Sequence, residues 1–326
     1  MTRPTKAFAG LAGISLVALS LSGCGGLSED TSSGSGPCEG VEADSVDAKA
    51  LDGVEVKAGS KEFDEQLVLG QLTLKMMCAA GADAKDETNT KGSTQARQKL
   101  IDGGSDVYWD YNGTGWINYL GHDKPITDPQ KQYEAVRDED LEKNKLVWGQ
   151  QAPFNNTYAF AVTKEFGEEE GIATHSDMAA YIKSNPDATV CVESEFAARP
   201  DGYPGFKKAY GITGGKIKSL GTGVVYTQLD KGGCDFGEIF TTDGRIAALG
   251  LTSLDDDKAF FPLYNGVPIV REETDKENPE ILEVLAPLAE VLTTEVMQEL
   301  NTKVSSEGQK PEKVAEDFLA EEGFIK

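Results

Sequence analysis

Hydrophobic residues along this chain follow two patterns, an alternation typical of β-strands and a spacing of three to four residues typical of helices. Residues 54–58 alternate between apolar and charged side chains, and residues 63–80, after a Gly-Ser turn, carry apolar side chains at helical spacing with one buried side. A short helix over 94–101 and a strand over 105–111 follow. Because strand–helix–strand units favour parallel pairing with right-handed crossovers, the pattern predicts an α/β fold built on a parallel sheet.

The rest of the chain repeats this alternation and is expected to form two lobes. Residues 152–162 contain a proline and two asparagines between strand patterns, which indicates a crossing into a second lobe, and residues 260–270 carry the chain back. Two lobes joined by two crossings predict a hinge with a cleft between the lobes. We assign residues 51–151 and 259–326 to the first lobe and residues 152–258 to the second. Further helices are expected over 129–145, 176–183, 206–210, 223–229, 279–291, 293–302 and 311–321, and further strands over 146–150, 188–192, 216–220 and 234–238.

The stretch SDVYWDYNGTGW at residues 105–116 is a strand that runs into a glycine turn and the start of a helix. Such a junction directs side chains and backbone N–H groups into a crevice. Alternation places Tyr108 and Asp110 on one face of the strand, with Tyr111 at the turn. An aromatic residue in a strand is as often a core residue as a functional one, and we expect Tyr111 to face a ligand.

The N-terminus resembles the signal peptide of a bacterial lipoprotein. Two basic residues precede the apolar run 7–21, which is too short to cross a bilayer comfortably, and the sequence Leu-Ser-Gly-Cys ends at Cys24, where a lipid would be attached. An ordinary signal peptide with an incidental cysteine is the alternative. Residues 25–50 begin rich in serine and glycine and predict a flexible tether. We therefore expect an exported protein, anchored by lipid to the outer face of the cell membrane.

Four cysteines remain when Cys24 is set aside, and an even number in an exported protein indicates disulfides with three possible pairings. Cys191 and Cys234 lie in strand patterns that one lobe could place side by side. We expect the pair Cys191–Cys234, which leaves Cys38–Cys78 to attach the N-terminal segment to the first helix.

Composition excludes several classes of function. The chain has 31 basic and 55 acidic residues, a formal net charge of −24, and phosphate binding needs clustered basic residues, so nucleic acid is not an expected partner. Only two histidines are present, and no Ser-His-Asp order, metal-ligand cluster or phosphate-binding glycine loop is found. We expect a monomer without cofactor or metal. An enzyme on a two-lobed fold and a surface adhesin are the alternatives from other classes.

Six stretches, in order, are similar to those of the osmoprotectant-binding proteins of ABC importers, which capture glycine betaine, carnitine, choline and related compounds. The resemblance extends from about residue 54 to the end of the chain. It implies a two-lobed periplasmic-binding-protein (type II) fold that closes on a small quaternary amine and delivers it to a permease and its ATPase, without catalysis. The stretches are GSKEFDEQ (59–66), DYNGT (110–114), PFNNTY (153–158), RPDG (199–202), TTDGRI (241–246) and FFPLYN (260–265).

The resemblance also implies a set of ligand-binding residues. Many relatives have a tyrosine where this chain has Phe240, so the ring face is kept and a hydroxyl is lost. The polar contacts of the family fall on Gln66 and Thr114, expected to hold a carboxylate, with Asn156 as a further candidate. The four rings of the family's aromatic cage fall on Tyr111, Tyr158, Phe240 and Tyr264.

The chemistry of the ligand agrees with this set. A quaternary ammonium has no N–H to donate, whereas aromatic faces attract it by about 0.5–1 kcal/mol when exposed and about 2 kcal/mol or more when desolvated. Gln66, Thr114 and the backbone N–H groups after Gly113 would supply neutral donors to a carboxylate. Choline or another cationic amine is the alternative ligand, and Asp110 or Asp243 could then provide an acidic contact.

Overall fold

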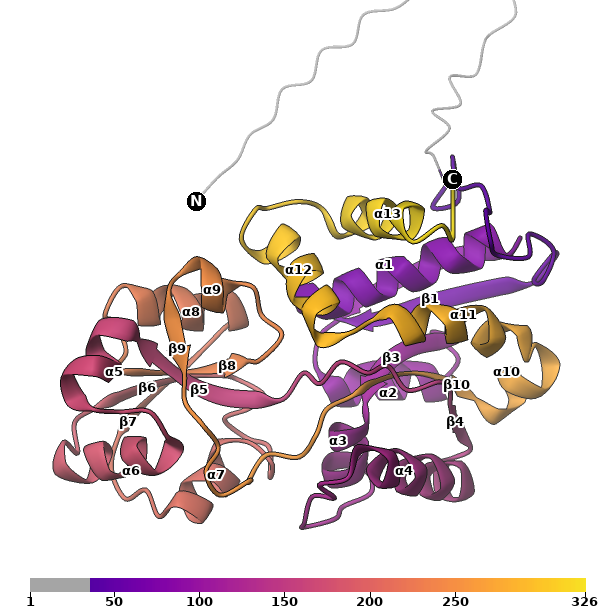
Figure 1. Cartoon of the computed structure of the whole chain (residues 1–326). Helices are drawn as coiled ribbons and strands as arrows, with labels where there is room; N and C mark the ends of the chain where they lie inside the picture. Colours follow the sequence, from indigo (N-terminus) through magenta and orange to yellow (C-terminus); the bar gives the residue numbers. More distant parts are fainter. Residues whose placement is uncertain (1–35) are drawn as a thin grey trace, which may run out of the picture. The chain divides into compact units, whose positions relative to one another are not determined.

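The computed structural model describes residues 36–326, so the predicted signal peptide and Cys24 lie outside the described residues. None of the helices in this described part is long and apolar enough to span a bilayer. The described chain forms two five-stranded sheets flanked by helices, which confirms the α/β class (Figure 1).

The first lobe is built on a sheet with the strand order β2-β1-β3-β10-β4 (Figure 1). β1 pairs in parallel with β2 and β3, but β10 runs antiparallel to both β3 and β4. The expected parallel pairing is therefore confirmed for β2, β1 and β3, but the sheet as a whole is mixed, because β10 enters it from the other lobe in the opposite direction. The strands are β1 (Glu55–Lys61), β2 (Asp83–Thr90), β3 (Val107–Tyr111), β4 (Leu146–Trp148) and β10 (Gly266–Arg271).

Helices cover both faces of this sheet, so all five residues of β3 are buried. Trp109 packs in the core formed with α1 and the C-terminal helices, while Tyr108 packs on the opposite face with residues of α2 and α4. This is the alternation that the sequence predicts for the strand. The helices are α1 (Asp64–Ala79), α2 (Ser93–Ile101), α3 (Asn112–Thr114), the π-helical turn η1 (Gly115–Tyr119), α4 (Pro129–Asn144), α10 (Glu272–Glu277), α11 (Glu280–Val291), α12 (Thr294–Ser305) and α13 (Pro311–Glu321).

The helix α1 is buried on nearly all sides rather than on the one side that its spacing predicts. It packs on β1 and β2, and α11, α12 and α13 pack on its remaining surface. The C-terminal helices thus bury a helix that already covers the sheet, and the sequence of α1 alone does not reveal this second layer.

The second lobe has the strand order β7-β6-β8-β5-β9, again with mixed directions. β6 pairs in parallel with β7 and β8, and β5 pairs antiparallel with β8 and β9. The strands are β5 (Tyr158–Thr163), β6 (Thr189–Glu193), β7 (Lys216–Leu220), β8 (Phe236–Phe240) and β9 (Leu251–Ser253), and the helices are α5 (Lys164–Glu170), α6 (His175–Ser184), α7 (Tyr203–Tyr210), α8 (Thr222–Asp230) and α9 (Arg245–Ala248).

Local signals set where several helices begin. The carboxylate of Asp128 accepts the Lys131 N–H at the start of α4, and Pro129 occupies the first helical position. Thr174 and Asp177 form a reciprocal capping box at the start of α6. Four elements, β2, β9, α5 and α10, were not predicted from the sequence pattern. β2 has the polar sequence DAKDETNT at a sheet edge, so it lacks the apolar alternation on which strand prediction depends.

The two crossings between the lobes lie side by side (Figure 1). Asn155 and Asn265 form an isolated antiparallel bridge, and the Asn156 N–H donates to the Tyr264 carbonyl at 3.0 Å. The side-chain oxygen of Asn155 accepts the Tyr264 N–H at 2.7 Å, and the side-chain amide of Asn265 donates to the Phe154 carbonyl at 2.9 Å. The two asparagines that signal a turn in the sequence therefore join the crossings to each other.

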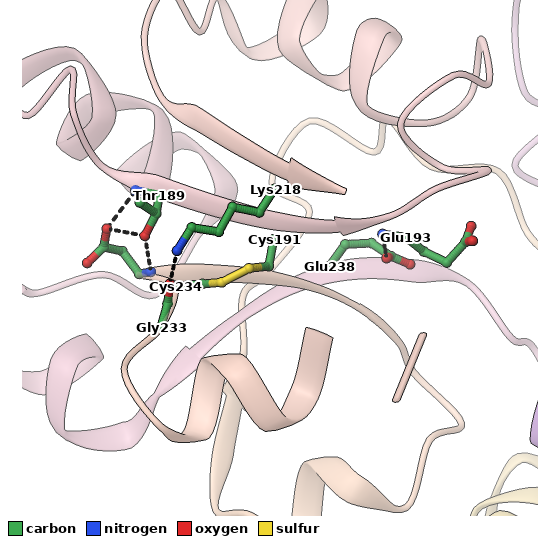
Figure 2. The surroundings of a disulfide bond; sticks show 8 residues. Thr189, Cys191, Glu193, Lys218, Gly233, Cys234 and Glu238 are labelled. Atoms are coloured by element: carbon green, nitrogen blue, oxygen red, sulfur yellow. Dashed lines mark hydrogen bonds between the residues drawn. A yellow bond between two sulfur atoms is a disulfide. The ribbon is translucent and has the colours of Figure 1, made fainter. Parts of the chain in front are cut away.

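The structure contains both expected disulfides. Cys191, on β6, is joined to Cys234, which precedes the neighbouring strand β8 (Figure 2), and Cys38 is joined to Cys78 in α1. Beyond Cys38 the N-terminal segment is also held by hydrogen bonds, because Ala43 forms a β-bridge with Ile325 near the C-terminus. The chain from Cys38 onward is therefore attached to the first lobe, and any free tether ends before it.

We expect the Cys191–Cys234 disulfide to stabilise the second lobe. Replacing both cysteines by alanine removes a cross-link between residues 43 positions apart, and the free energy of unfolding should fall by about 2–4 kcal/mol. Urea denaturation of the variant and the parent measures this loss. Four free thiols among these cysteines in the oxidised parent, or an unchanged unfolding midpoint in the variant, would contradict the assignment.

Candidate functional site

A cavity with about 520 Å³ of empty space, including its mouth, lies between the lobes. Both lobes and both crossings supply its walls. The first lobe contributes Lys61, Glu62, Phe63, Ser93, Tyr111 and Thr114, the second contributes Tyr158, Glu193, Glu195, Arg199, Thr222 and Phe240, and the crossings contribute Asn156 and Tyr264.

The ends of paired strands bring the aromatic residues of this cavity together. Tyr158 begins β5 and Phe240 ends β8, and the two residues face each other in register. Tyr111 ends β3 and pairs with Gly266, two residues after Tyr264. All four predicted cage rings therefore line one cavity, although they come from segments far apart in the sequence.

Neighbouring rings of this set pack directly on one another, at the centroid distances of aromatic pairs. The centroid of Tyr158 lies 5.0 Å from that of Phe240 and 5.2 Å from that of Tyr264, whose ring stands nearly perpendicular to it. Phe63 is a fifth ring, stacked on Phe240 at 5.6 Å and 6.3 Å from Tyr111. In the sequence, Phe63 is recognisable only as the first apolar residue of the α1 pattern, so its place in the cavity wall was not predicted.

Glycine at position 113 allows the turn after β3 to approach the cavity wall. A Cβ atom there would lie 2.5 Å from the Leu263 carbonyl oxygen and 2.7 Å from the Tyr264 ring. Any side chain at 113 would therefore displace Tyr264, which explains the glycine in this turn.

Gln66 lies behind the ring of Tyr111 and does not line the cavity. Its side-chain amide donates to the Tyr111 hydroxyl at 3.1 Å, and its side-chain oxygen accepts the Lys61 N–H at 3.1 Å. Thr114 does line the cavity, and Asn156 lines it with a side-chain oxygen that has no partner among the described residues. The structure thus separates Gln66, a residue expected to touch the ligand, from the cavity itself.

Two cations that the sequence analysis did not select reach the cavity wall. Arg199 donates to the Thr114 hydroxyl at 3.3 Å and to Asp201 at 2.6 Å, and its guanidinium lies 5.6 Å from the Tyr158 ring. Burial raises the pKa of Asp201, but the charge and hydrogen bonds of Arg199, with the hydrogen bonds from Tyr264 and Asn118, together leave this pKa below its ordinary value. The RPDG stretch was a signal for Arg199, and only the folded chain shows that it meets Thr114 from the other lobe.

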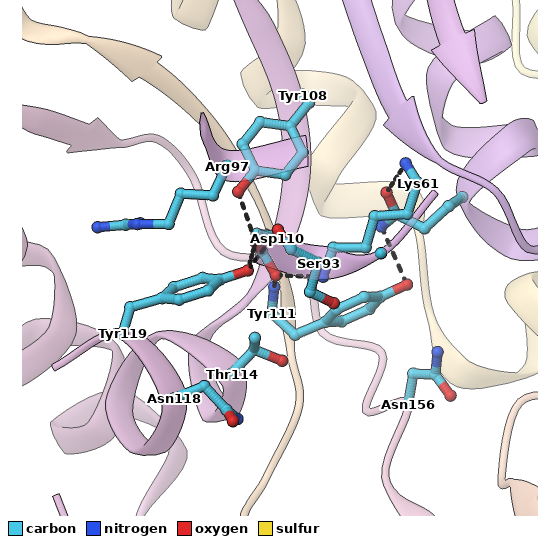
Figure 3. Close-up of polar contacts among 12 residues, drawn as sticks. Lys61, Ser93, Arg97, Tyr108, Asp110, Tyr111, Thr114, Asn118, Tyr119 and Asn156 are labelled. Carbon is cyan, nitrogen blue, oxygen red and sulfur yellow. Dashed lines mark hydrogen bonds and ion pairs between the residues drawn. The ribbon is translucent and has the colours of Figure 1, made fainter. Parts of the chain in front are cut away.

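Lys61 is the second of these cations and is held by Asp110. Its ammonium lies 2.7 Å from the Asp110 carboxylate, which also accepts the hydroxyls of Tyr108 and Tyr119 (Figure 3). Burial raises the pKa of Asp110, but Lys61, together with the hydrogen bonds from the Tyr108 hydroxyl and the Tyr111 N–H, leaves this pKa below its ordinary value. Asp110 is therefore fully engaged inside the first lobe.

The acidic contacts considered for a cationic ligand are not part of this cavity. Asp110 is completely buried with the partners described above, and Asp243 forms a 2.6 Å ion pair with Arg245. The carboxylates that do line the cavity are those of Glu62, Glu193 and Glu195.

Glu238 is a buried acid beside the cavity. It lies two residues before Phe240 on β8, and one carboxyl oxygen accepts the Glu193 N–H at 2.9 Å (Figure 2), while the other has no partner among the described residues. Burial raises the pKa of Glu238 to about 8, and the neighbouring charge of Glu193 adds to this increase. Glu238 is therefore mainly protonated at neutral pH.

Comparison with known proteins identifies relatives over most of the described chain. A family model described as the substrate-binding domain of ABC-type glycine betaine transport systems matches residues 54–321. The glycine-betaine-binding protein of Pseudomonas aeruginosa is 37% identical over 278 residues, covering 83% of this chain and 88% of that protein. Glycine betaine-binding protein YehZ of Escherichia coli is 31% identical over 279 residues, covering 83% and 92% of the two chains.

A solved structure supports the same relationship. A crystal structure described as a glycine betaine/carnitine/choline ABC transporter aligns with a TM-score of 0.68 at 32% identity, covering 82% of this chain and 99% of that chain. The two-lobed binding-protein fold is thereby confirmed. The relatives are substrate-binding proteins rather than enzymes, which removes the enzymatic alternative.

The raised pKa of Glu238 predicts a pH-dependent stability. Its folded pKa of about 8 exceeds its ordinary value of 4.5, so the stability that it contributes is full below about pH 4.5 and is lost as the pH rises through 8. Between these limits the free energy of unfolding should fall, relative to Glu238→Gln, by up to about 1.4 kcal/mol per pH unit.

Urea denaturation of both proteins across this pH range tests the prediction. Glu312→Gln, at an exposed position of α13, is the matched control and should track the parent at every pH. A difference between parent and Glu238→Gln that stays constant with pH would show that Glu238 is already ionised in the folded protein.

Proposed function

This chain belongs to the family of substrate-binding domains of ABC-type glycine betaine transport systems, and we propose that its cavity binds a zwitterionic quaternary amine of the glycine betaine or carnitine type. The observation that carries this proposal is the convergence of ring faces from both lobes on one cavity. The protein would capture the ligand by closing its lobes and present it to a membrane permease driven by an ATPase.

The aromatic end of the cavity would hold the methylated cation. The ring centroid of Tyr158 lies 5.0 Å from that of Phe240 and 5.2 Å from that of Tyr264, and Tyr111 completes the set from the first lobe. The three tyrosine rings are buried and Phe240 is half-buried, and a desolvated cation–π contact is worth about 2 kcal/mol or more. The free side-chain oxygen of Asn156 also suits a methylated ammonium, which has no N–H to share but carries positive charge on its methyl groups.

The polar end would hold the carboxylate. Thr114, Arg199 and Lys61 line the cavity and supply the donors, so the carboxylate binds with charge assistance as well as with neutral donors. Gln66 contributes indirectly, because it fixes the Tyr111 hydroxyl from behind. A zwitterion then places its negative end beside these two cations and its positive end among the rings, leaving neither charge unpaired.

Phe240 stands where many relatives have a tyrosine, and it still places a ring at this wall of the cavity. A phenylalanine keeps the π face that a cation needs but offers no hydroxyl, so Phe240 favours recognition by ring faces and shape at this wall. Phe63 stacks on it across the lobes and extends the apolar surface.

The N-terminal features fit this role. A lipid on Cys24 would hold the protein at the outer face of the cell membrane, and the segment before Cys38 would allow it to reach its permease. A monomer suffices for this mechanism, since one chain supplies every residue of the cavity.

Calorimetric titration with glycine betaine, carnitine and choline tests the ligand class. We expect the two zwitterions to bind in the micromolar range, about −8 kcal/mol, and choline to bind more weakly because it lacks the carboxylate that Arg199 and Lys61 would pair with. Binding of choline alone would move the assignment to cationic amines, and no binding of any of the three would reject the proposal.

Removing a cage ring should weaken binding while the fold persists. We expect Tyr111→Ala and Tyr264→Ala each to raise the dissociation constant for glycine betaine at least about tenfold, since each loses a desolvated ring face. Tyr133→Ala, at a half-buried tyrosine of α4 outside the cavity, is the control and should bind like the parent. Unchanged affinity in both cage variants would show that the ligand binds elsewhere.

A further inference from the structure

We propose that Glu65 is a positioning residue of the binding site, whose buried carboxylate fixes the cage ring of Tyr111 and joins it to the crossing and to the second lobe. This role rests on the proposed function, because it concerns the affinity of the same cavity. Glu65 itself does not line that cavity and would not touch the ligand.

The carboxylate of Glu65 accepts four side-chain hydrogen bonds, two on each oxygen. One oxygen accepts from the Tyr111 hydroxyl at 2.7 Å and from the Asn156 amide at 2.7 Å. The other accepts from the Thr242 hydroxyl at 2.6 Å and from the Asn301 amide at 2.9 Å. All five side chains are buried, so water cannot replace any of these contacts without local opening.

The four donors come from four different parts of the fold. Tyr111 ends β3 in the first lobe, Asn156 lies in the first crossing, and Thr242 follows β8 in the second lobe. Asn301, in α12, also donates to the Thr242 carbonyl at 2.9 Å. One carboxylate on the first turn of α1 thus holds a cage ring, a crossing and the far lobe in a single arrangement.

This arrangement determines which way the Tyr111 hydroxyl points. The hydroxyl accepts a hydrogen bond from Gln66 at 3.1 Å, so its own proton is free to be donated to Glu65. The two contacts approach the hydroxyl from adjacent residues of α1 and fix the ring plane that faces the cavity. Without Glu65 the hydroxyl would keep only Gln66, and the ring could rotate away from the cation.

All four neighbours donate hydrogen bonds to residue 65, so its side chain must accept at both ends. A carboxylate accepts through both oxygens, whereas an amide has only one oxygen. A glutamine at 65 would turn an NH₂ group toward two of the four donors, and buried donors left without an acceptor cost about 1–3 kcal/mol each. Burial raises the pKa of Glu65, and the four hydrogen bonds oppose that increase. No cation pairs with this carboxylate among the described residues, since the nearby Arg245 is engaged with Asp64 and Asp243.

A second contact between the lobes runs beside this carboxylate. Asp64, the preceding residue, forms a 3.0 Å ion pair with Arg245 in α9. A Cβ atom on Gly244 would lie 2.1 Å from the Thr302 hydroxyl of α12, so the turn after β8 packs directly on the first lobe. The hydrogen bonds of Glu65 therefore lie in a closely packed junction, where a small displacement would be transmitted to Tyr111.

A double-mutant cycle on ligand affinity separates positioning from a general effect on folding. The variants are Glu65→Gln, Tyr111→Phe and the two combined, with glycine betaine as the probe. We expect each single change to raise the dissociation constant at least about fivefold, and the combination to raise it by no more than about twice the larger single effect. Glu65 would then act through the Tyr111 hydroxyl. The proposal would be overturned if the increase in the dissociation constant of the double variant equalled the product of the two single increases. It would also be overturned if Glu65→Gln folded and bound glycine betaine with the affinity of the parent.

If Glu65→Gln does not fold, the variant Thr242→Val still tests the role of Glu65. It removes only the donor from the second lobe, and we expect the ligand to dissociate at least about threefold faster with little change in the association rate. Thr252→Val, at an exposed position of β9, is the control and should leave both rates unchanged. An unchanged dissociation rate in Thr242→Val would overturn the link between the lobes.

The two proposals fail in different ways. A parent protein that binds none of the quaternary amines would reject the proposed function, and the positioning role would fall with it. A parent that binds glycine betaine while Glu65→Gln and Thr242→Val bind equally well would leave the function intact and reject only the role of Glu65.

Discussion

A cation without N–H groups can be held only by surfaces that attract charge without hydrogen bonding, and this constraint governs the architecture of the site. Ring faces meet it, but several must converge on one small volume. The register of Tyr158 with Phe240 places two faces side by side in the second lobe. The antiparallel entry of β10 beside β3 brings Tyr264 near Tyr111. The mixed strand directions therefore build the aromatic wall of the cavity, because an all-parallel arrangement would not bring these strand ends together.

Charged groups around the cavity are held in place by partners behind it. Arg199 is fixed by Asp201, and Lys61 by Asp110, so each cation is oriented before a ligand arrives. The carboxylates in turn accept tyrosine hydroxyls, Tyr264 on Asp201 at 2.6 Å and Tyr108 on Asp110 at 2.5 Å. Preorganised polar groups lose little entropy when they bind a ligand, which raises the affinity that these contacts can provide.

Sequence patterns identified the parts of the site that depend on local chemistry. The strand that ends at Tyr111, the glycine turn after it and the asparagines of the crossing have signals within a few residues of each other. The disulfide between Cys191 and Cys234 followed from two strand patterns in one lobe, and the structure places these strands as neighbours. The resemblance to a family then supplied Tyr158, Phe240 and Tyr264, which no local pattern distinguishes from core aromatics.

Site contacts between residues far apart in the sequence could not be predicted from local patterns. Arg199 reaches Thr114 across 85 positions, and Asn301 reaches Glu65 across 236 positions, so neither contact has a local signal. The ring of Tyr111 lies between Gln66 and the cavity. This placement depends on how α1 packs against β3, which the sequence of neither element shows.

The most direct test of the account compares glycine betaine with 3,3-dimethylbutyrate, in which carbon replaces the charged nitrogen and the shape and carboxylate are kept. If ring faces recognise the positive charge, calorimetry should show 3,3-dimethylbutyrate, whose tert-butyl group is uncharged, binding at least about thirtyfold more weakly, the equivalent of one desolvated cation–π contact of about 2 kcal/mol. Equal affinity for the two compounds would mean that the cavity recognises shape and carboxylate alone, and the aromatic residues would then be apolar packing rather than a cation site.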